Sequence, residues 1–242
     1  MEQEFDIVVF GATSFVGKIL AGRMLSQLGS GGKVRWAIAG RSKARLNSLR
    51  DELGPQAVDL PILIADASDD ESLQALCART RVVVSTVGPY ALYGEPLVRA
   101  CVESGTDYCD LTGEVQWIRR MIQLYEARAK VTGARIVHCC GFDSVPSDLG
   151  VWFLQQQAVE KFGQPASRAK MRVRAAKGGL SGGTVASLMN VVREAASNKA
   201  LRQELANPFS ICPPEHRSVE RQPDVKSAEF DPDFGVWLAP FI

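Results

Sequence analysis

Residues 6–20, DIVVFGATSFVGKIL, join an apolar run to a turn with two glycines and then to a segment with helical spacing. Gly11 and Gly17 lie six residues apart, and Ser14 stands midway between them. A turn of this kind between a strand and a helix brings backbone N–H groups to a helix N-terminus, where a phosphate can bind. The stretch therefore predicts a phosphate-binding turn, and the rest of the chain tests whether the surrounding fold suits it.

The chain alternates apolar runs with segments of helical periodicity as far as residue 160. After the first turn, Val16, Leu20, Met24 and Leu28 recur four apart and form one stripe of a helix. Apolar strands that alternate with helices are typical of a parallel sheet covered on both faces. We therefore expect a doubly wound α/β fold of the Rossmann, dinucleotide-binding type. The expected strands are residues 5–10, 34–40, 60–66, 81–88, 106–111 and 135–141.

The sequence predicts two domains. Residues 1–150 form the NAD(P)-binding Rossmann domain, and residues 151–242 form a substrate and dimerisation domain of α+β type. In the second domain, the strict alternation of residues 168–177 predicts a half-buried strand, and residues 184–205 predict a helix. The chain ends in the apolar run FGVWLAPFI, which is similar to an interrupted strand, so we expect the second domain to be incomplete.

The composition is that of an ordinary globular protein, with 46% hydrophobic and 23% charged residues. The 28 basic and 27 acidic residues leave a net charge of +1, which argues against a nucleic-acid partner. The acidic start lacks the basic region of a signal peptide, and no apolar run is long enough to span a bilayer. The six cysteines form no CxxC pair, so we expect no metal site and a reducing, cytoplasmic location, with membrane association left open.

The first turn can bind a pyrophosphate through its backbone. Gly11 permits the tight turn, and Gly17 lets the helix pack close to the sheet. The N–H groups of residues 12–16 then face the anion, and two hydroxyls can add donors. The alternative is an ordinary strand–helix turn with a serine cap. The binding residues predicted here are Gly11, Thr13, Ser14, Phe15, Val16 and Gly17.

The end of the second strand indicates which dinucleotide binds. An NAD enzyme typically carries an acidic residue there, whereas this chain reads AGRSKARL, with Arg41, Ser42 and Lys43. A guanidinium can bind a 2′-phosphate with two hydrogen bonds, so the segment favours NADP over NAD. The alternative is that both cations are solvated and that the serine only caps a helix. Asp66, followed by Ala67, ends the third strand and can bind the adenine amino group or cap a helix.

The fourth strand ends in TVGPY, beside the first strand in the usual order of this fold. Thr86, Val87, Gly88 and Pro89 are therefore predicted to lie along the nicotinamide, although a Gly-Pro turn also occurs in loops without such a role.

Carboxylates follow the fifth and sixth strands, at the edge of the sheet where substrates bind. Any of them can donate a proton if burial raises its pKa, and each can instead cap a helix. His138, near the end of the sixth strand, is more typical of a core histidine with a backbone partner. The four carboxylates are Asp110, Glu114, Asp143 and Asp148, and the candidate proton donors are Tyr90, Asp110 and Asp143.

Four segments of the chain, taken in order, resemble the saccharopine dehydrogenase-like oxidoreductases: FGATSFVGKILAGRML, AGRSKARL, VVVSTVGPYALYGEPLVRACVESGTDYCDLTGE and HCCGFDSVPSDLG. They look closest to the branch that contains bacterial trans-acting enoyl reductases. The resemblance implies an NADP-binding domain followed by an α+β domain that closes over the nicotinamide and often carries dimer contacts. Ser14 departs from the GATGxxG form common in the family, and a side chain there restricts positive φ.

The expected function is hydride transfer from NADPH to an enoyl, lipid-type substrate or to an imine. The resemblance implies a small-molecule or carrier-bound lipid substrate, a homodimer and peripheral association with lipid. Two alternatives stay open: a nucleotide-binding, lipid-associated interaction protein without turnover, and saccharopine dehydrogenase proper. The second alternative requires cationic groups for several carboxylates, and the sequence assigns no such set.

Overall fold

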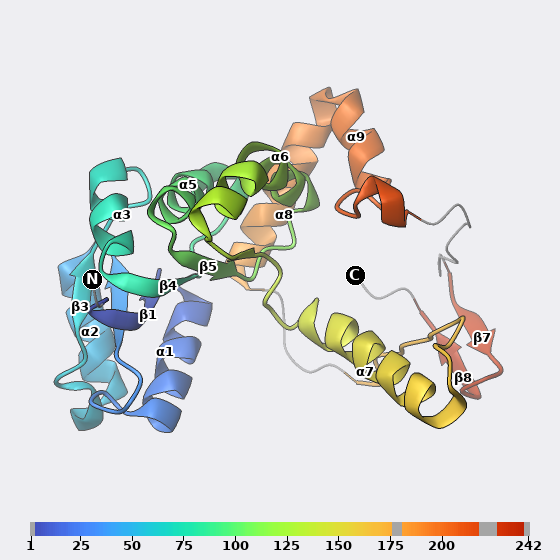
Figure 1. Ribbon diagram of the computed structural model, residues 1–242, viewed down its shortest axis with the longest axis horizontal. Helices are drawn as coiled ribbons and strands as arrows, with labels where there is room; N and C mark the ends of the chain where they lie inside the picture. The colour runs from blue at the N-terminus through green and yellow to red at the C-terminus, as the bar shows by residue number, and fades with distance from the viewer. Residues whose placement is uncertain (1–2, 176–180, 218–226, 240–242) are drawn as a thin grey trace.

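A computed structural model describes residues 3–175, 181–217 and 227–239. Its centre is a six-stranded parallel sheet in the order β3-β2-β1-β4-β5-β6, shown in Figure 1. This order is that of the doubly wound dinucleotide-binding fold, so the predicted fold class is confirmed. The strands are β1 (Phe5–Phe10), β2 (Trp36–Gly40), β3 (Ile62–Ile64), β4 (Thr80–Ser85), β5 (Asp107–Asp110) and β6 (Ile136–Val137).

The strand order reverses at β1, which pairs with β2 on one side and with β4 on the other. In this register Phe10, the last residue of β1, lies opposite Ala39 and Ser85. The loops that follow β1 and β4 therefore leave the sheet side by side. In open α/β sheets the crevice between two such loops is where ligands bind.

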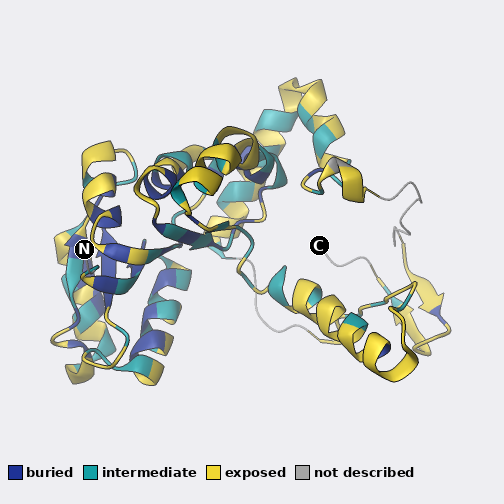
Figure 2. Cartoon of the chain, in the orientation of Figure 1, coloured by how far each residue is buried: buried dark blue, intermediate teal, exposed yellow. Residues whose placement is uncertain are grey.

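Helices cover both faces of the sheet, and alternate residues of β1 point to opposite cores. Val9 packs with Ile38 and the helices α1 and α2, whereas Val8 packs with the side of α3, α5 and α6. Figure 2 shows these layers as the buried part of the molecule. The helices of this region are α1 (Phe15–Leu28), α2 (Lys43–Leu53), α3 (Asp70–Cys77), α4 (Tyr90–Tyr93), α5 (Glu95–Ser104) and α6 (Val115–Thr132).

The remaining elements are α7 (Val145–Phe162), α8 (Gly182–Ser197), α9 (Lys199–Leu205), β7 (Glu229–Asp231) and β8 (Val236–Leu238). The predicted helix over 184–205 is two helices, because Asn198 ends α8 and caps α9 through its side chain, which accepts from Leu201 N. The predicted strand over 168–177 is wrong for residues 168–175, and residues 176–180 lie outside the described part. The basic side chains Lys170 and Arg172 bind Asp231 of β7, and no ladder of backbone hydrogen bonds forms there. The two-domain division stays a prediction.

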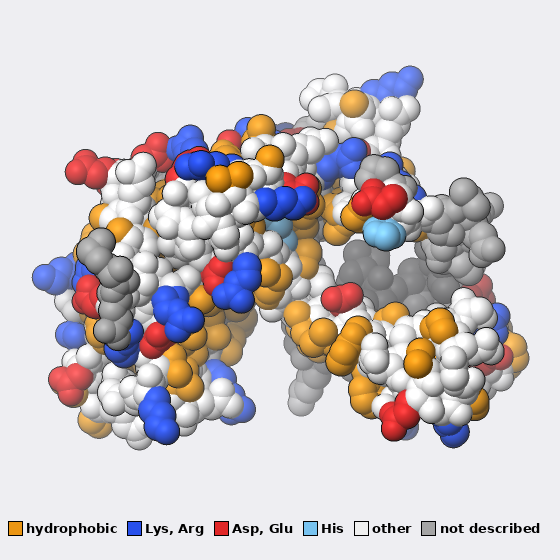
Figure 3. Space-filling model, viewed as in Figure 1, with side chains coloured by type: hydrophobic (Ala, Val, Ile, Leu, Met, Phe, Trp, Pro, Cys, Tyr) orange, Lys and Arg blue, Asp and Glu red, His pale blue; other side chains and the backbone are white. Residues whose placement is uncertain are grey.

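Several large apolar side chains are exposed along α7. Leu149, Trp152 and Phe153 are each more than half exposed, and the hydrophobic side chains over this helix are visible in Figure 3. Over the described residues, none of the helices combines the length and the apolar character that crossing a membrane requires.

Candidate functional site

The turn after β1 has the geometry of a phosphate-binding loop. Gly11 adopts φ +83°, and Ser14 caps α1 by accepting a hydrogen bond from Gly17 N at 2.9 Å. The first N–H groups of a helix have no acceptor within the helix, so the amides of Phe15 and Val16 are available to an anion. Phe15 and Val16 also line the cavity described below. The loop is therefore a capped helix start whose free N–H groups fit the predicted binding of an anion.

Close contacts leave no room for a side chain at either glycine of the turn: Gly17 lies against backbone atoms, and Gly11 lies against the side chains of Val87 and Thr86. A Cβ atom on Gly17 would lie 2.4 Å from the Gly11 carbonyl oxygen and 2.8 Å from Ala12 Cα. A Cβ atom on Gly11 would lie 2.6 Å from Val87 Cγ2. The chain thus keeps a tight backbone cradle at the N-terminus of α1, which fits the pyrophosphate of a dinucleotide.

Ser14 explains why the middle of the turn needs no glycine. Its backbone is extended, with φ −69° and ψ 166°, so positive φ is not required there. Its hydroxyl lies 2.9 Å from the Thr86 hydroxyl, which also donates to the Gly11 carbonyl at 2.8 Å. A hydroxyl at position 14 therefore ties the phosphate loop to the loop that follows β4.

The residues that follow β2 and β3 are predicted to bind the adenosine end of NADP, and their contact with the nucleotide stays a prediction. Hydrogen bonds from the Ser68 backbone and hydroxyl lower the pKa of the Asp66 carboxylate. The positive charge of Arg41, which is exposed, lowers it further. Ser42 caps α2 by accepting from Arg45 N at 3.4 Å, as the alternative for this residue proposed. Lys43 and Ala67 follow Ser42 and Asp66 in sequence, with Lys43 exposed and Ala67 packed against the core.

The loop after β4 is fixed to the sheet. Thr86 N donates to the Phe10 carbonyl at 2.9 Å, and Val87 packs against the core. Gly88 lines the cavity, and Pro89 stands at the start of α4. Their contact with a nicotinamide stays a prediction.

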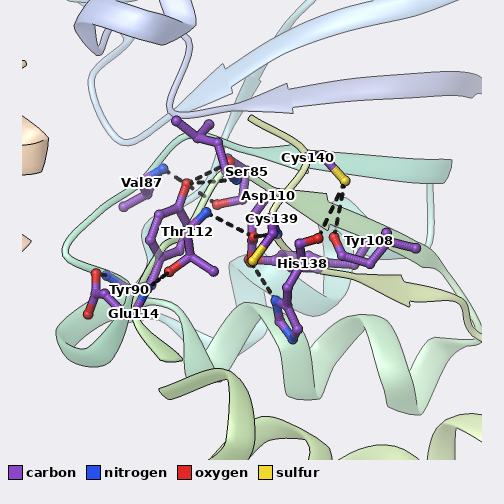
Figure 4. A network of polar contacts seen from close by, with 12 residues as sticks. Ser85, Val87, Tyr90, Tyr108, Asp110, Thr112, Glu114, His138, Cys139 and Cys140 are labelled. Atoms are coloured by element: carbon purple, nitrogen blue, oxygen red, sulfur yellow. Dashed lines mark hydrogen bonds and ion pairs between the residues drawn. The ribbon is translucent and has the colours of Figure 1, made fainter. Parts of the chain in front are cut away.

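Asp110 lies in a buried network, drawn in Figure 4. Its Oδ2 atom accepts from the Tyr108 hydroxyl at 2.9 Å and contacts His138 Nδ1 at 2.7 Å. Its Oδ1 atom accepts from the backbone N–H groups of Thr112 and Cys139. Both carboxylate oxygens are therefore engaged, and Asp110 is not among the described residues that line the cavity. The partner of His138 is a carboxylate, where the sequence favoured a backbone group.

The other two candidate proton donors differ in their accessibility. The Tyr90 hydroxyl donates to the Ser85 carbonyl at 3.0 Å, and burial, followed by the charge of Asp110, raises the pKa of this phenol. Asp143 is exposed and lines the cavity. Tyr90 lines the cavity too but is buried, so Asp143 is the more accessible of the two, and the catalytic assignments stay predictions.

A cavity of about 350 Å³ connects these elements. It is bounded by the phosphate turn, the loops after β4 and β5, Asp143, and the faces of α8 and α9. Its apolar side chains come from Phe15, Val16, Leu111, Val115, Leu188, Val191 and Leu205. Of the described residues around it, two are acidic, Glu114 and Asp143, and none is lysine, arginine or histidine.

Sequence reasoning placed Glu114 at this edge of the sheet but missed its contacts. Its carboxylate accepts from Tyr90 N and from the hydroxyl of Ser187, which lies on α8. One local signal was available, since a short helix that begins after Pro89 has no side chain of its own to cap it. Ser187 gave no signal, because only the folded chain brings α8 to the cavity.

Comparison with known proteins gives the family. The model of the saccharopine dehydrogenase NADP-binding domain matches residues 7–137, which is more than half of the chain. A trans-acting enoyl reductase of Mycobacterium tuberculosis is 42% identical over 248 residues, covering 100% of this chain and 59% of that protein. The corresponding protein of Mycobacterium ulcerans is 40% identical, with the same coverage. The chain therefore spans somewhat more than half the length of these curated relatives.

A solved structure shares the fold. Apo saccharopine dehydrogenase (L-Glu forming) from Saccharomyces cerevisiae aligns with a TM-score of 0.51 and 19% identity, over 66% of this chain and 32% of that one. The match of the NADP-binding family model confirms the predicted cofactor and the predicted resemblance. The glycine cradle and the capped start of α1 agree with it. This chain belongs to the saccharopine dehydrogenase family through its NADP-binding domain.

Proposed function

We propose that this chain is the nucleotide-binding part of an NADP-dependent oxidoreductase that reduces the double bond of an enoyl group on an apolar acyl chain. The observation that carries the proposal is the cavity that runs from the phosphate turn, past Thr86 and Gly88, to Leu188 and Val191. A substrate in this cavity would lie beside residues 86–89, which are predicted to contact the nicotinamide and are called the nicotinamide loop below. The relatives named as trans-acting enoyl reductases support the same reaction class.

The charge of the cavity favours a neutral substrate. Glu114 and Asp143 are its acidic residues, and the described lining contains no cation. A substrate with several carboxylates, such as saccharopine, would have to lose water next to these acids without a compensating positive charge, which is costly. An enoyl group carries no charge, and burial of its acyl chain against leucine and valine side chains lowers the free energy of binding. The geometry therefore disfavours saccharopine dehydrogenase proper.

The bound cofactor would supply a hydride at its nicotinamide ring. The chain's own residues would do the rest. The amides of Phe15 and Val16 bind the pyrophosphate, and Arg41 binds the 2′-phosphate. The loop over Thr86 and Gly88 orients the ring, and the apolar side chains exclude water. Asp143, at the rim, relays a proton from solvent to the substrate.

The test follows the absorbance of NADPH: its oxidation with enoyl thioesters of short and long acyl chains and with an imine, and its formation from NADP⁺ with saccharopine, which is already the reduced compound. We expect turnover with the long-chain enoyl thioester, and little with saccharopine. Turnover with saccharopine alone would contradict the proposal. Tight binding of NADPH without turnover of any of these compounds would favour the interaction protein without turnover.

A further inference from the structure

Glu114 is a buried carboxylate that joins three segments around the cavity. The residue is 4% exposed and follows β5. Its Oε1 atom accepts from Tyr90 N at 2.7 Å, and its Oε2 atom accepts from Ala91 N at 2.9 Å. The hydroxyl of Ser187, on α8, donates to Oε1 at 2.8 Å. One side chain therefore connects the loop after β5, the start of α4 and a helix from the last third of the chain.

The contacts with Tyr90 and Ala91 fix the loop that precedes them. The first N–H groups of α4 have no acceptor within the helix, and Pro89 offers no side-chain cap. Glu114 supplies that cap from a different strand. Because α4 follows directly on Thr86 and Gly88, its start sets the direction in which this loop leaves the sheet.

Glu114 is itself held in place by the end of β5. Its backbone N–H donates to the Thr112 hydroxyl at 3.1 Å, and Thr112 N donates to Asp110 Oδ1 at 3.1 Å. Its carboxylate partners in the described part of the chain are neutral N–H and O–H groups. Hydrogen bonds of this kind to a charged group are short and directional, so they fix geometry as well as add stability.

We propose that Glu114 is a positioning residue, which fixes the nicotinamide loop through α4 and connects it through Ser187 to α8, the helix that bounds the cavity. The inference rests on the proposed reductase function and adds to it the group that holds the ring in place. Glu114 touches neither phosphate turn nor Arg41 in the described contacts, so cofactor affinity and ring orientation are separable.

The test compares Glu114→Gln with the unchanged full chain. The amide keeps the size of the carboxylate, but one of its ends donates, so it cannot accept from both Tyr90 N and Ala91 N. We expect the Kd for NADPH to stay within about threefold of the unchanged value. The increase in nicotinamide fluorescence that accompanies the binding of NADPH should be lost, and kcat should fall about 10- to 100-fold. Glu95→Gln is the matched control, since Glu95 begins α5 and pairs with Arg120 outside the cavity. It should change none of these three quantities.

Ser187→Ala provides an independent variant on the other side of the contact. It should lower the emission of bound NADPH and kcat, but by less than Glu114→Gln does. In the Glu114→Gln background, Ser187→Ala should cause no further decrease in either quantity. Unchanged emission in both variants would overturn the inference. So would a variant that loses NADPH affinity and also no longer unfolds cooperatively, because both losses together indicate a structural role alone. If the unchanged chain reduces no substrate, the proposed reaction fails, whereas the emission of bound NADPH still decides the role of Glu114.

Discussion

The close contact between Gly17 and the phosphate turn makes a quantitative prediction for Gly17→Ala. The new Cβ would lie 2.4 Å from the Gly11 carbonyl oxygen, whereas real Cβ atoms essentially never approach within 3.0 Å. The neighbouring atoms at this position are backbone atoms, so the turn and the helix must separate by at least about half an ångström. Overpacking of this kind costs about 1–3 kcal/mol of folding free energy, of which the better helix propensity of alanine returns up to about 1 kcal/mol.

The effect on cofactor binding should exceed the effect on stability. A shift of the turn misaligns at least one N–H group from the pyrophosphate, and a hydrogen bond to a charged group is worth about 1.5–3 kcal/mol. At about 1.4 kcal/mol per factor of ten, the Kd for NADPH should rise about 10- to 100-fold. Fluorescence titration with NADPH gives the Kd, and denaturant unfolding gives the change in folding free energy.

Gly22→Ala is the control on the same helix. Its Cβ would lie 3.5 Å from Leu53 Cδ2, an ordinary van der Waals contact, so this variant should fold at least as stably and bind NADPH as the unchanged chain does. The reasoning is refuted if Gly17→Ala also binds NADPH with unchanged affinity, or if both variants weaken binding equally.

Three further predictions follow from single contacts. Arg41→Ala should weaken NADPH binding about tenfold or more and leave NADH binding unchanged, by titration of both nucleotides, because only NADPH carries the 2′-phosphate. Hydrogen bonds from Arg135 lower the pKa of Asp107 in the folded state. The ionised carboxylate therefore stabilises the fold above its unfolded pKa, and this stabilisation is lost as the pH falls through the lower pKa of the folded state. Arg135→Gln should make the free energy of unfolding decline less steeply below about pH 4. Tyr90→Phe should lower the free energy of unfolding by about 1–2 kcal/mol, since the buried Ser85 carbonyl loses its donor, and a collapse of kcat at unchanged stability would instead assign the phenol to proton transfer.

Local patterns predicted the nucleotide-binding half well. The apolar runs of residues 5–10 and 81–88 give the strands β1 and β4, and Gly54 ends the helix that Ser42 caps. The beginning and end of each such element depend on residues within a few positions, so they are legible in the sequence. The alternation over residues 168–177 predicted a strand that is wrong for residues 168–175, because a strand needs a partner strand and periodicity does not supply one.

The contacts of the candidate site required the tertiary structure. The sequence identified Asp110 and Glu114 as carboxylates at the binding edge, but their roles depend on donors that are distant along the chain. Asp110 meets His138, 28 residues on, and Glu114 meets Ser187, 73 residues on. Contacts between side chains of separate loops produce no periodic pattern in the sequence of either loop.

The sequence by itself determined the fold class, the tight glycine turn after the first strand and the preference for NADP, because each depends on short-range patterns: apolar spacing, two glycines, and a basic residue after the second strand. Only the tertiary structure showed that the backbone of Ser14 is extended, so that no glycine is needed there, and that its hydroxyl lies beside that of Thr86. It also decided that the cavity next to this turn has acids and no described cation, since the charge of a cavity depends on which distant side chains the fold brings to its wall.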